Sequence, residues 1–95
     1  MSKKFRDENT DMLMRAVASF KSIDECYEFF EDLCSPSEIK TMSQRFQVAR
    51  MIKGNKLYSE IVSETGVATA TISRVRNSLI SGNGGYDRAI ERMEN

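Results

Sequence analysis

The side chains best suited to chemistry in this 95-residue sequence are hydroxyls, arginines and one amide gathered between positions 69 and 77. They are Thr69, Thr71, Ser73, Arg74, Arg76 and Asn77. Hydroxyl and amide groups hydrogen-bond to base edges and phosphate oxygens, and arginine binds phosphate through charge-assisted hydrogen bonds. The segment therefore carries the groups that a DNA major groove accepts. The plain alternative is an ordinary helical hairpin with a solvated polar face, because short matches of this kind also arise by chance.

Residues 58–79 have the layout of a helix-turn-helix that would position these groups. Ile61 and Val62 predict the buried side of a first short helix, and Gly66 supplies a backbone that accepts positive φ at the corner. The apolar residues of a second helix recur at three- and four-residue spacing; they are Val67, Ile72, Val75 and Leu79. The second helix would pack through these residues onto the first, which leaves its polar residues facing outward.

Composition restricts both the fold and the class of function. One proline and five glycines, with abundant Met, Leu, Ala, Glu, Arg and Lys, favour a single all-α domain. No apolar run reaches the ~20 residues that span a bilayer, so we expect a soluble, cytoplasmic protein. The absence of histidine removes the commonest general base and argues against an enzyme. No cofactor is expected.

The two cysteines do not form a metal site or a disulfide in this reading. Without histidine or a second cysteine pair, the sequence lacks a zinc ligand set. Cys26 and Cys34 would lie ~12 Å apart along one helix, beyond disulfide reach. We expect both to be small buried hydrophobic residues in a reducing compartment.

The formal net charge of zero conceals an uneven distribution. Residues 1–38 carry five cations and nine anions, net −4, whereas residues 39–80 carry seven cations and two anions, net +5. Residues 81–95 carry two cations and three anions, net −1. The positive block contains the helix-turn-helix, so this part would be attracted to a polyanion. Random scatter of surface charge is the alternative over blocks this short.

The N-terminal third predicts a mobile arm and two helices. Residues 1–9 are polar and charged, and we expect them to be mobile. A first helix is predicted over residues 10–20, and a second from the capping box of Ser22 and Glu25 to about Cys34. The second helix is apolar around more than one stripe, so it must bury two sides. One side can meet the first helix, and the other requires a further surface.

The middle and the end of the chain predict the remaining helices. The string Ser35-Pro36-Ser37-Glu38 combines a serine cap, a proline at the first helical position and a glutamate at the third. The long helix behind it has an apolar stripe, Ile39, Met42, Phe46, Ala49 and Ile52. It is expected to end at a glycine stop, Gly54, after a lysine in the last turn. Beyond the flexible segment 81–85, residues 86–94 predict a last helix.

With these residues in place, the chain resembles the tryptophan-repressor superfamily, in its YerC/YecD-like branch. The resemblance rests on a gapless match from Gly54 to Leu79, through Ser59-Glu60-Ile61, Glu64-Thr65-Gly66, Ala70-Thr71-Ile72-Ser73-Arg74 and Asn77-Ser78-Leu79. It implies an all-α fold of about six helices and an intertwined homodimer, with residues 10–53 of both subunits forming the dimerisation core. The two helix-turn-helix units would then reach successive major grooves of a pseudo-palindromic site.

Helix position and the resemblance together give the candidate DNA contacts. Thr69, Ala70 and Ser73 lie at the N-terminal, outward face of the second helix and are candidates for base edges, Ala70 through a thymine methyl group. The candidate phosphate contacts are Thr71, Arg74, Arg76, Lys56 and Ser43. None of the base-contacting candidates can form two hydrogen bonds to a single base, as arginine or asparagine can. We therefore expect modest direct readout, supplemented by phosphate contacts, water and DNA shape.

The resemblance also implies a candidate effector slot formed by Gln44, Arg45, Arg74, Val75 and Ser78. Arg74 and Ser78 match the family's ligand-contacting arginine and serine, whereas the second arginine falls on Gln44, with Arg45 one place away. Val75 stands where the tryptophan repressor has a glycine that leaves room for the indole. Close packing leaves little space for its three extra carbons, so tryptophan is not expected to bind. Ordinary core packing also explains Val75 fully.

The sequence thus predicts a homodimeric, sequence-specific DNA-binding transcriptional regulator, a repressor by resemblance, that uses no metal and no membrane. Two alternatives stay open. One is a protein-interaction module that uses the helix-turn-helix or the acidic helix around residues 24–32. The other is a tryptophan-responsive repressor. An enzyme is the least favoured class.

Overall fold

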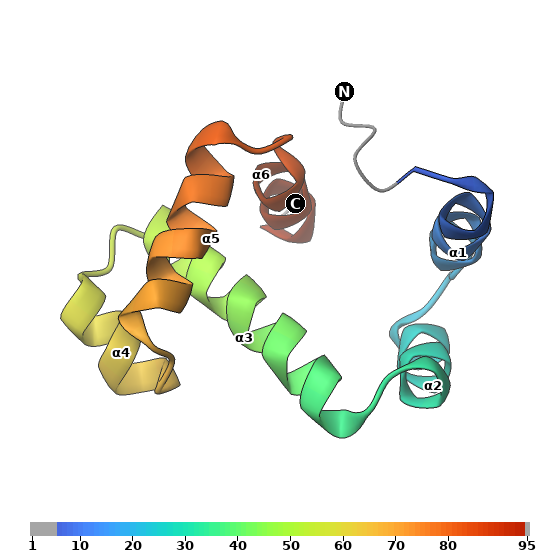
Figure 1. Cartoon of the computed structure of the whole chain (residues 1–95), viewed down its shortest axis with the longest axis horizontal. Coiled ribbons are helices and arrows are strands. Elements are labelled where there is room, and N and C mark those ends of the chain that lie inside the picture. The colour runs from blue at the N-terminus through green and yellow to red at the C-terminus, as the bar shows by residue number, and fades with distance from the viewer. Residues whose placement is uncertain (1–5, 95) are drawn as a thin grey trace. The chain divides into compact units, whose positions relative to one another are not determined.

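The structure, a computed structural model, describes residues 6–94, and all regular secondary structure in that range is helical (Figure 1). The helices are α1 (Glu8–Ala18), α2 (Ile23–Leu33), α3 (Pro36–Lys53), α4 (Tyr58–Thr65), α5 (Thr69–Ser81) and α6 (Gly85–Glu94). This confirms the predicted all-α class and the order of six helices. The chain divides into two compact units, which we call the N-terminal unit, up to Ile39, and the head, from Lys40 onward.

The first two helices start at capping residues. Asp7 caps α1, and its Oδ1 accepts a hydrogen bond from the Thr10 N–H at 2.7 Å. This bond holds the pKa of the Asp7 carboxyl below its ordinary value. The cap starts α1 at Glu8, two residues earlier than predicted; residues 1–5 of the expected mobile arm lie outside the described residues. Ser22 caps α2 as predicted, accepting from the Glu25 N–H at 3.1 Å.

The N-terminal unit has little interior of its own. The rings of Phe20 and Phe29 pack with centroids 5.1 Å apart, yet no residue of α1 or α2 is buried. Large apolar side chains stay exposed, including Ile23 at 75% and Tyr27 at 62%. Within the described part of this chain, Phe29 of α2 packs on Phe20, and the other apolar side of α2 has no covering surface, as expected for the side that requires a further surface. Both cysteines, expected to be buried, are half-buried free thiols.

The long helix α3 begins and ends where predicted, although the residue that stops it is different. At its start the Ser35 N–H donates to Glu38 Oε1 at 2.8 Å and the Glu38 N–H donates to Ser35 Oγ at 3.2 Å, a reciprocal capping box. The backbone and hydroxyl of Ser35 hold the pKa of Glu38 below its ordinary value. Pro36 occupies the first helical position.

The helix ends after Lys53, as predicted, but the residue that terminates it in the left-handed conformation is Asn55 rather than Gly54. The Gly54 N–H still bonds the Arg50 carbonyl at 3.0 Å, and the left-handed residue is Asn55, at φ 62°. The Asn55 N–H bonds Ile52 O and the Lys56 N–H bonds Met51 O, each at 3.0 Å, the pattern of a Schellman cap. Asparagine adopts the left-handed region more readily than most residues, so it ends the helix without needing glycine.

All four helices of the head contribute to one core. The buried side chains are Val48 and Ala49 from α3, Ile61 from α4, Ile72 and Val75 from α5, and Ile90 from α6. Around them pack the half-buried side chains of Phe46, Met51, Ile52, Val67, Leu79 and Tyr86. The core thus ties α5 to every other helix of the head.

Three core assignments from sequence need correction. Val62 was expected to be buried with Ile61, but it is 36% exposed. Adjacent residues on a helix point about 100° apart, so an eight-residue helix packed mainly on one side buries only one of them. Met42, expected on the apolar stripe of α3, is 44% exposed, whereas Val48, absent from that stripe, is fully buried. None of the helices described here is both long and apolar enough to cross a membrane.

Candidate nucleic-acid interface

The turn between α4 and α5 is short and fixed by hydrogen bonds. Gly66 has φ 73°, and its N–H donates to the Val62 carbonyl at 2.8 Å, which confirms the corner expected there. The Thr65 hydroxyl donates to Ile61 O at 2.7 Å and accepts from the Val67 N–H at 3.2 Å. These bonds satisfy the polar groups at the corner and hold the start of α5 against α4.

The first turn of α5 leaves backbone donors available. Ala68 precedes the helix and its side chain makes no capping bond. Its carbonyl accepts from the N–H groups of Thr71 at 2.9 Å and Ile72 at 3.3 Å. The N–H groups ahead of them, at Thr69 and Ala70, have no intrahelical acceptor, as at every helix N-terminus. Such donors bind phosphate well when a duplex lies against them.

The two faces of α5 are clearly separated. Ile72 and Val75 enter the core, at 0% and 2% exposure. Thr69, Ala70 and Ser73, the candidates for base edges, are all exposed on the same helix. Ser73 lies four residues after Thr69 and three after Ala70, so it is a surface neighbour of both on this helix. The structure thus gathers the base-contacting candidates at the start of α5, away from the core.

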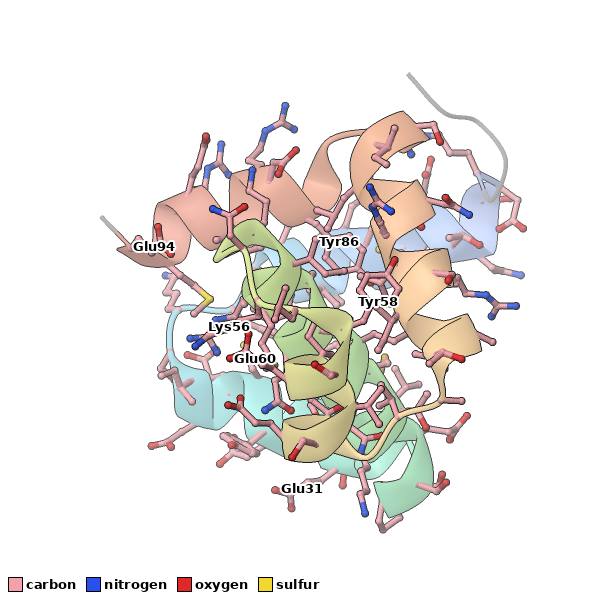
Figure 2. The ribbon with its side chains drawn as sticks, turned by 90° about the vertical axis from the view of Figure 1, so that its left-hand side faces the viewer. Glu31, Lys56, Tyr58, Glu60, Tyr86 and Glu94 are labelled. Carbon is pink, nitrogen blue, oxygen red and sulfur yellow. The ribbon has the colours of Figure 1, made fainter. Side chains whose placement is uncertain are left out.

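The phosphate candidates are spread over three elements. Arg74 and Arg76 are exposed on α5, and Thr71 on the same helix is half-buried. Lys56, labelled in Figure 2, is exposed on the link before α4. Ser43 is exposed on α3, where its hydroxyl donates to the Lys40 carbonyl at 2.9 Å.

One cation and one carboxylate of residues 39–80, Lys53 and Glu60, already have partners within the head. The Lys53 ammonium lies 2.8 Å from Asp87 Oδ1 on α6, and this carboxylate raises the pKa of Lys53. The Glu60 carboxylate accepts from the Leu57 N–H at 2.9 Å at the start of α4. Lys53 therefore faces the acidic helix α6, and the positive field for a polyanion comes from the other cations of the block.

The candidate effector residues differ in burial and in which of them line the hollows beside α5. Val75 is a core side chain at 2% exposure. Arg74 and Ser78 line an open hollow of about 420 Å³, together with Asn77, Ser81 and Gly82. A neighbouring hollow of about 410 Å³ is lined by Phe46, Ser78, Gly82, Asn83, Gly85, Tyr86 and Ala89. Gln44 and Arg45 are half-buried on α3 and line neither of these two hollows.

Sequence reasoning missed the contacts that join α3 to α6. The rings of Phe46 and Tyr86 stack at 6.4 Å between centroids with 25° between planes, and Lys53 pairs with Asp87. Each pair is separated by more than 30 residues in the chain. A single sequence carries no local signal for such pairs, because helical spacing describes only one element at a time.

Comparisons with known proteins extend over nearly the whole chain. The family model described as Trp repressor protein matches residues 8–94. The uncharacterized protein YerC of Bacillus subtilis (strain 168) is 44% identical over 91 residues, which cover 96% of this chain and 88% of that protein.

Solved structures match closely as well. A Staphylococcus aureus protein, provisionally assigned as a Trp repressor, superposes with a TM-score of 0.92 at 45% identity, over 99% of this chain and 95% of that one. A TrpR-like protein from Eubacterium eligens ATCC 27750 gives a TM-score of 0.92 at 46% identity, over 98% and 96% of the two chains. The likeness therefore includes the N-terminal unit as well as the head.

Proposed function

The chain belongs to the Trp repressor protein family, and from that premise we propose that it is a sequence-specific DNA-binding repressor of transcription. It acts in the cytoplasm as a homodimer and does not need tryptophan. The family is one of non-enzymatic, DNA-binding regulators, which agrees with the lack of histidine in the sequence.

The observation that carries the proposal is the two-sided character of α5. Its apolar residues enter the core of the head, while Thr69, Ala70 and Ser73 lie exposed beside the free N–H groups of its first turn. A helix in a major groove presents its N-terminal residues to base edges and its flanking cations to phosphates. Arg74 and Arg76 supply such cations.

The homodimer is supported by the uncovered apolar surface of the N-terminal unit. Met12, Ile23, Tyr27 and Leu33 are each more than half exposed on two neighbouring helices. Large exposed apolar patches mark interaction surfaces. A two-fold dimer would also present two copies of α5 at the spacing of successive major grooves.

Independence from tryptophan is supported by Val75. Its side chain packs among Ile72 and the other core residues, so the position that would have to stay open for an indole is filled. Arg74 and Ser78 stay accessible at the open hollow on α5, and Arg74 is then free to bind phosphate.

The proposal is tested by measuring binding to mixed genomic fragments at several salt concentrations. The full chain should bind DNA with an affinity that falls steeply with salt, by a slope of about −0.9 for each phosphate contact. Arg74→Ala should weaken binding to all sequences alike and reduce the slope by about 1. Arg92→Ala, which removes the same charge from α6, is the matched control and should change little.

Two outcomes would change the proposal. If micromolar protein causes no salt-sensitive shift of any fragment, DNA binding is rejected and the protein-interaction module is favoured instead. Titration calorimetry with tryptophan should give no binding heat. Heat typical of a micromolar site would mean that the slot accepts an indole despite Val75, and the tryptophan-responsive repressor would replace our proposal.

A further inference from the structure

We propose that the Lys53–Asp87 ion pair positions the recognition helix α5 for DNA binding by fixing its C-terminal end. The inference rests on the proposed function, because it gives two residues that touch no DNA a role in that function. Lys53 and Asp87 are positioning residues, and the argument for them depends on how α5 is held at each end.

Both ends of α5 are tied down, in different ways. The N-terminal end is held against α4 by the Gly66 turn. At the other end the Gly82 N–H bonds the Ser78 carbonyl at 2.9 Å, and a Cβ on Gly82 would lie 2.3 Å from that oxygen. This position therefore has no room for a side chain. Since α6 begins only three residues later, at Gly85, the short link keeps the end of α5 close to the first turn of α6 (Figure 1).

The first turn of α6 is held on α3 at two separate points. Tyr86, labelled in Figure 2, stacks on Phe46, and Asp87 pairs with Lys53 at 2.8 Å. Phe46 and Lys53 are seven residues apart, or about 10 Å along the helix axis. Contacts at two points fix the direction of α6 as well as its position. Ile90, one turn further on, then enters the same core as α5.

The electrostatic surroundings set Lys53 apart from the phosphate candidates. Asp87 faces its ammonium directly, and Glu91 and Glu94 of α6 add weaker favourable interactions. A cation paired with a carboxylate attracts DNA less than an unpaired one. Two explanations of the ion pair therefore predict opposite changes in DNA affinity when Asp87 is lost. If its charges acted only through long-range attraction to DNA, loss of Asp87 would strengthen binding; if the pair positions α5, loss of Asp87 weakens it.

The decisive variant is Asp87→Asn, compared with Glu91→Gln, which removes the same charge from α6 and keeps the ion pair. We expect Asp87→Asn to weaken DNA binding about two- to fivefold, the range of one exposed ion pair. Glu91→Gln should bind as well as the unchanged protein or better. All variants should keep the same salt slope, because no phosphate contact is lost.

Charge reversal gives a test by rescue. Lys53→Asp alone should weaken binding, and the double variant Lys53→Asp with Asp87→Lys should return to within about twofold of the unchanged protein, since the pair is restored with its ends exchanged. Binding is measured at a temperature where circular dichroism shows every variant to be fully folded. A double variant that stays as weak as the single one overturns the inference.

Amide hydrogen exchange gives a readout that does not require DNA. In Asp87→Asn the Gly82 and Arg88 N–H groups, bonded to Ser78 O and Gly84 O, should exchange faster, while the Gly66 N–H should not change. General destabilisation would accelerate all three. The inference fails if Gly82 and Arg88 are unaffected, or if Asp87→Asn binds DNA as tightly as Glu91→Gln.

The two failures are distinguishable. If the unchanged protein binds no DNA, the proposed function is rejected, and with it the role of the pair in DNA binding. The exchange rates then still decide whether the ion pair holds the end of α5. If the unchanged protein binds DNA, and Asp87→Asn alters neither the DNA affinity nor the amide exchange of Gly82 and Arg88, only the positioning role is rejected.

Discussion

The N-terminal unit and the head are built from similar helices but differ in what covers them. Both helices of the N-terminal unit begin at side-chain caps, Asp7 for α1 and Ser22 for α2, whereas α5 of the head begins after Ala68, whose side chain makes no capping bond. All six buried side chains of the described chain nevertheless belong to the head, and α1 and α2 have none. A cap therefore helps a helix to begin but does not bury it, because burial depends on a second surface that only the head provides for itself.

This difference has a consequence for stability. Isolated helices shorter than about 12–15 residues are marginal in water, and α1 and α2 have 11 residues each. Without an interior of their own, they would gain most of their stability from the further surface that the proposed homodimer provides. The head has its own core and does not need one. The N-terminal unit should therefore respond to protein concentration, and the head should respond to changes in its core.

The largest expected effect is the loss of a core side chain in the head. Ile61→Ala, at a fully buried position, should lower the free energy of unfolding by about 2–5 kcal/mol through the cavity it leaves. Ile23→Ala, at a position 75% exposed in this chain, is the comparison in the N-terminal unit. Its effect should be below about 0.5 kcal/mol if water covers the site.

Urea unfolding at several protein concentrations separates the two explanations of Ile23. A larger loss that varies with concentration would mean that a second copy covers the N-terminal unit. Equal losses for Ile61→Ala and Ile23→Ala at every concentration would contradict the contrast between the two regions.

An intermediate effect is expected at the tight cap of α5. Gly82→Ala would place a Cβ 2.3 Å from the Ser78 carbonyl, and overpacking of this kind costs about 1–3 kcal/mol. Gly85→Ala is the control, because nothing lies within 4 Å of its added Cβ and alanine favours a helix. Thermal melts should show a lower Tm for Gly82→Ala alone. Equal Tm values for the two variants would mean that the loop at Gly82 can move to accommodate the added methyl group.

The smallest effect concerns acid. Asp7 and Glu38 of the N-terminal unit have lowered pKa values, so their caps stabilise above the unfolded values of about 3.8 and 4.5 and lose this stabilisation as the pH falls through the folded values. Lys53 of the head has a raised pKa, so its contribution is lost only above about 10.5. Mild acid should therefore loosen the starts of α1 and α3 before the head.

Amide exchange followed from about pH 6 to about pH 3 checks this order. After correction for the intrinsic pH dependence of exchange, the protection of the Thr10 and Glu38 N–H groups should fall first, and that of Gly66 should persist. Asp7→Asn and Glu38→Gln should remove most of the pH dependence. Simultaneous loss at all three sites would show that acid acts on the whole chain rather than on the caps.

Features that depend on neighbours in sequence were predicted well. The capping boxes at Ser22 and Ser35, the Gly66 corner and the last helix near residues 86–94 lie where expected, within two residues. Each involves groups at most four residues apart, and their geometry is the same in any protein. The stop at Gly54 failed because two residues able to end a helix, Gly54 and Asn55, are adjacent, and sequence alone does not rank them.

Features that depend on packing were predicted less well. The stripe of α3 included Met42 and missed Val48, because three other helices converge on its C-terminal half and shift the buried face. In the interface, the outward residues of α5 could be chosen from helical spacing. Ser43, Lys56 and the candidate effector residues Gln44 and Arg45 lie on other elements, and their roles stay predictions.

The sequence by itself determined the helices, their order and the polar character of α5, because caps, glycine turns and apolar spacing act within a few residues. Only the tertiary structure decided which side of each helix is covered. It assigned Val48 to the core and Lys53 to an ion pair with Asp87, and it left the apolar surface of α1 and α2 uncovered. The physical reason is that burial and ion pairing depend on distances between remote segments, which no local pattern encodes.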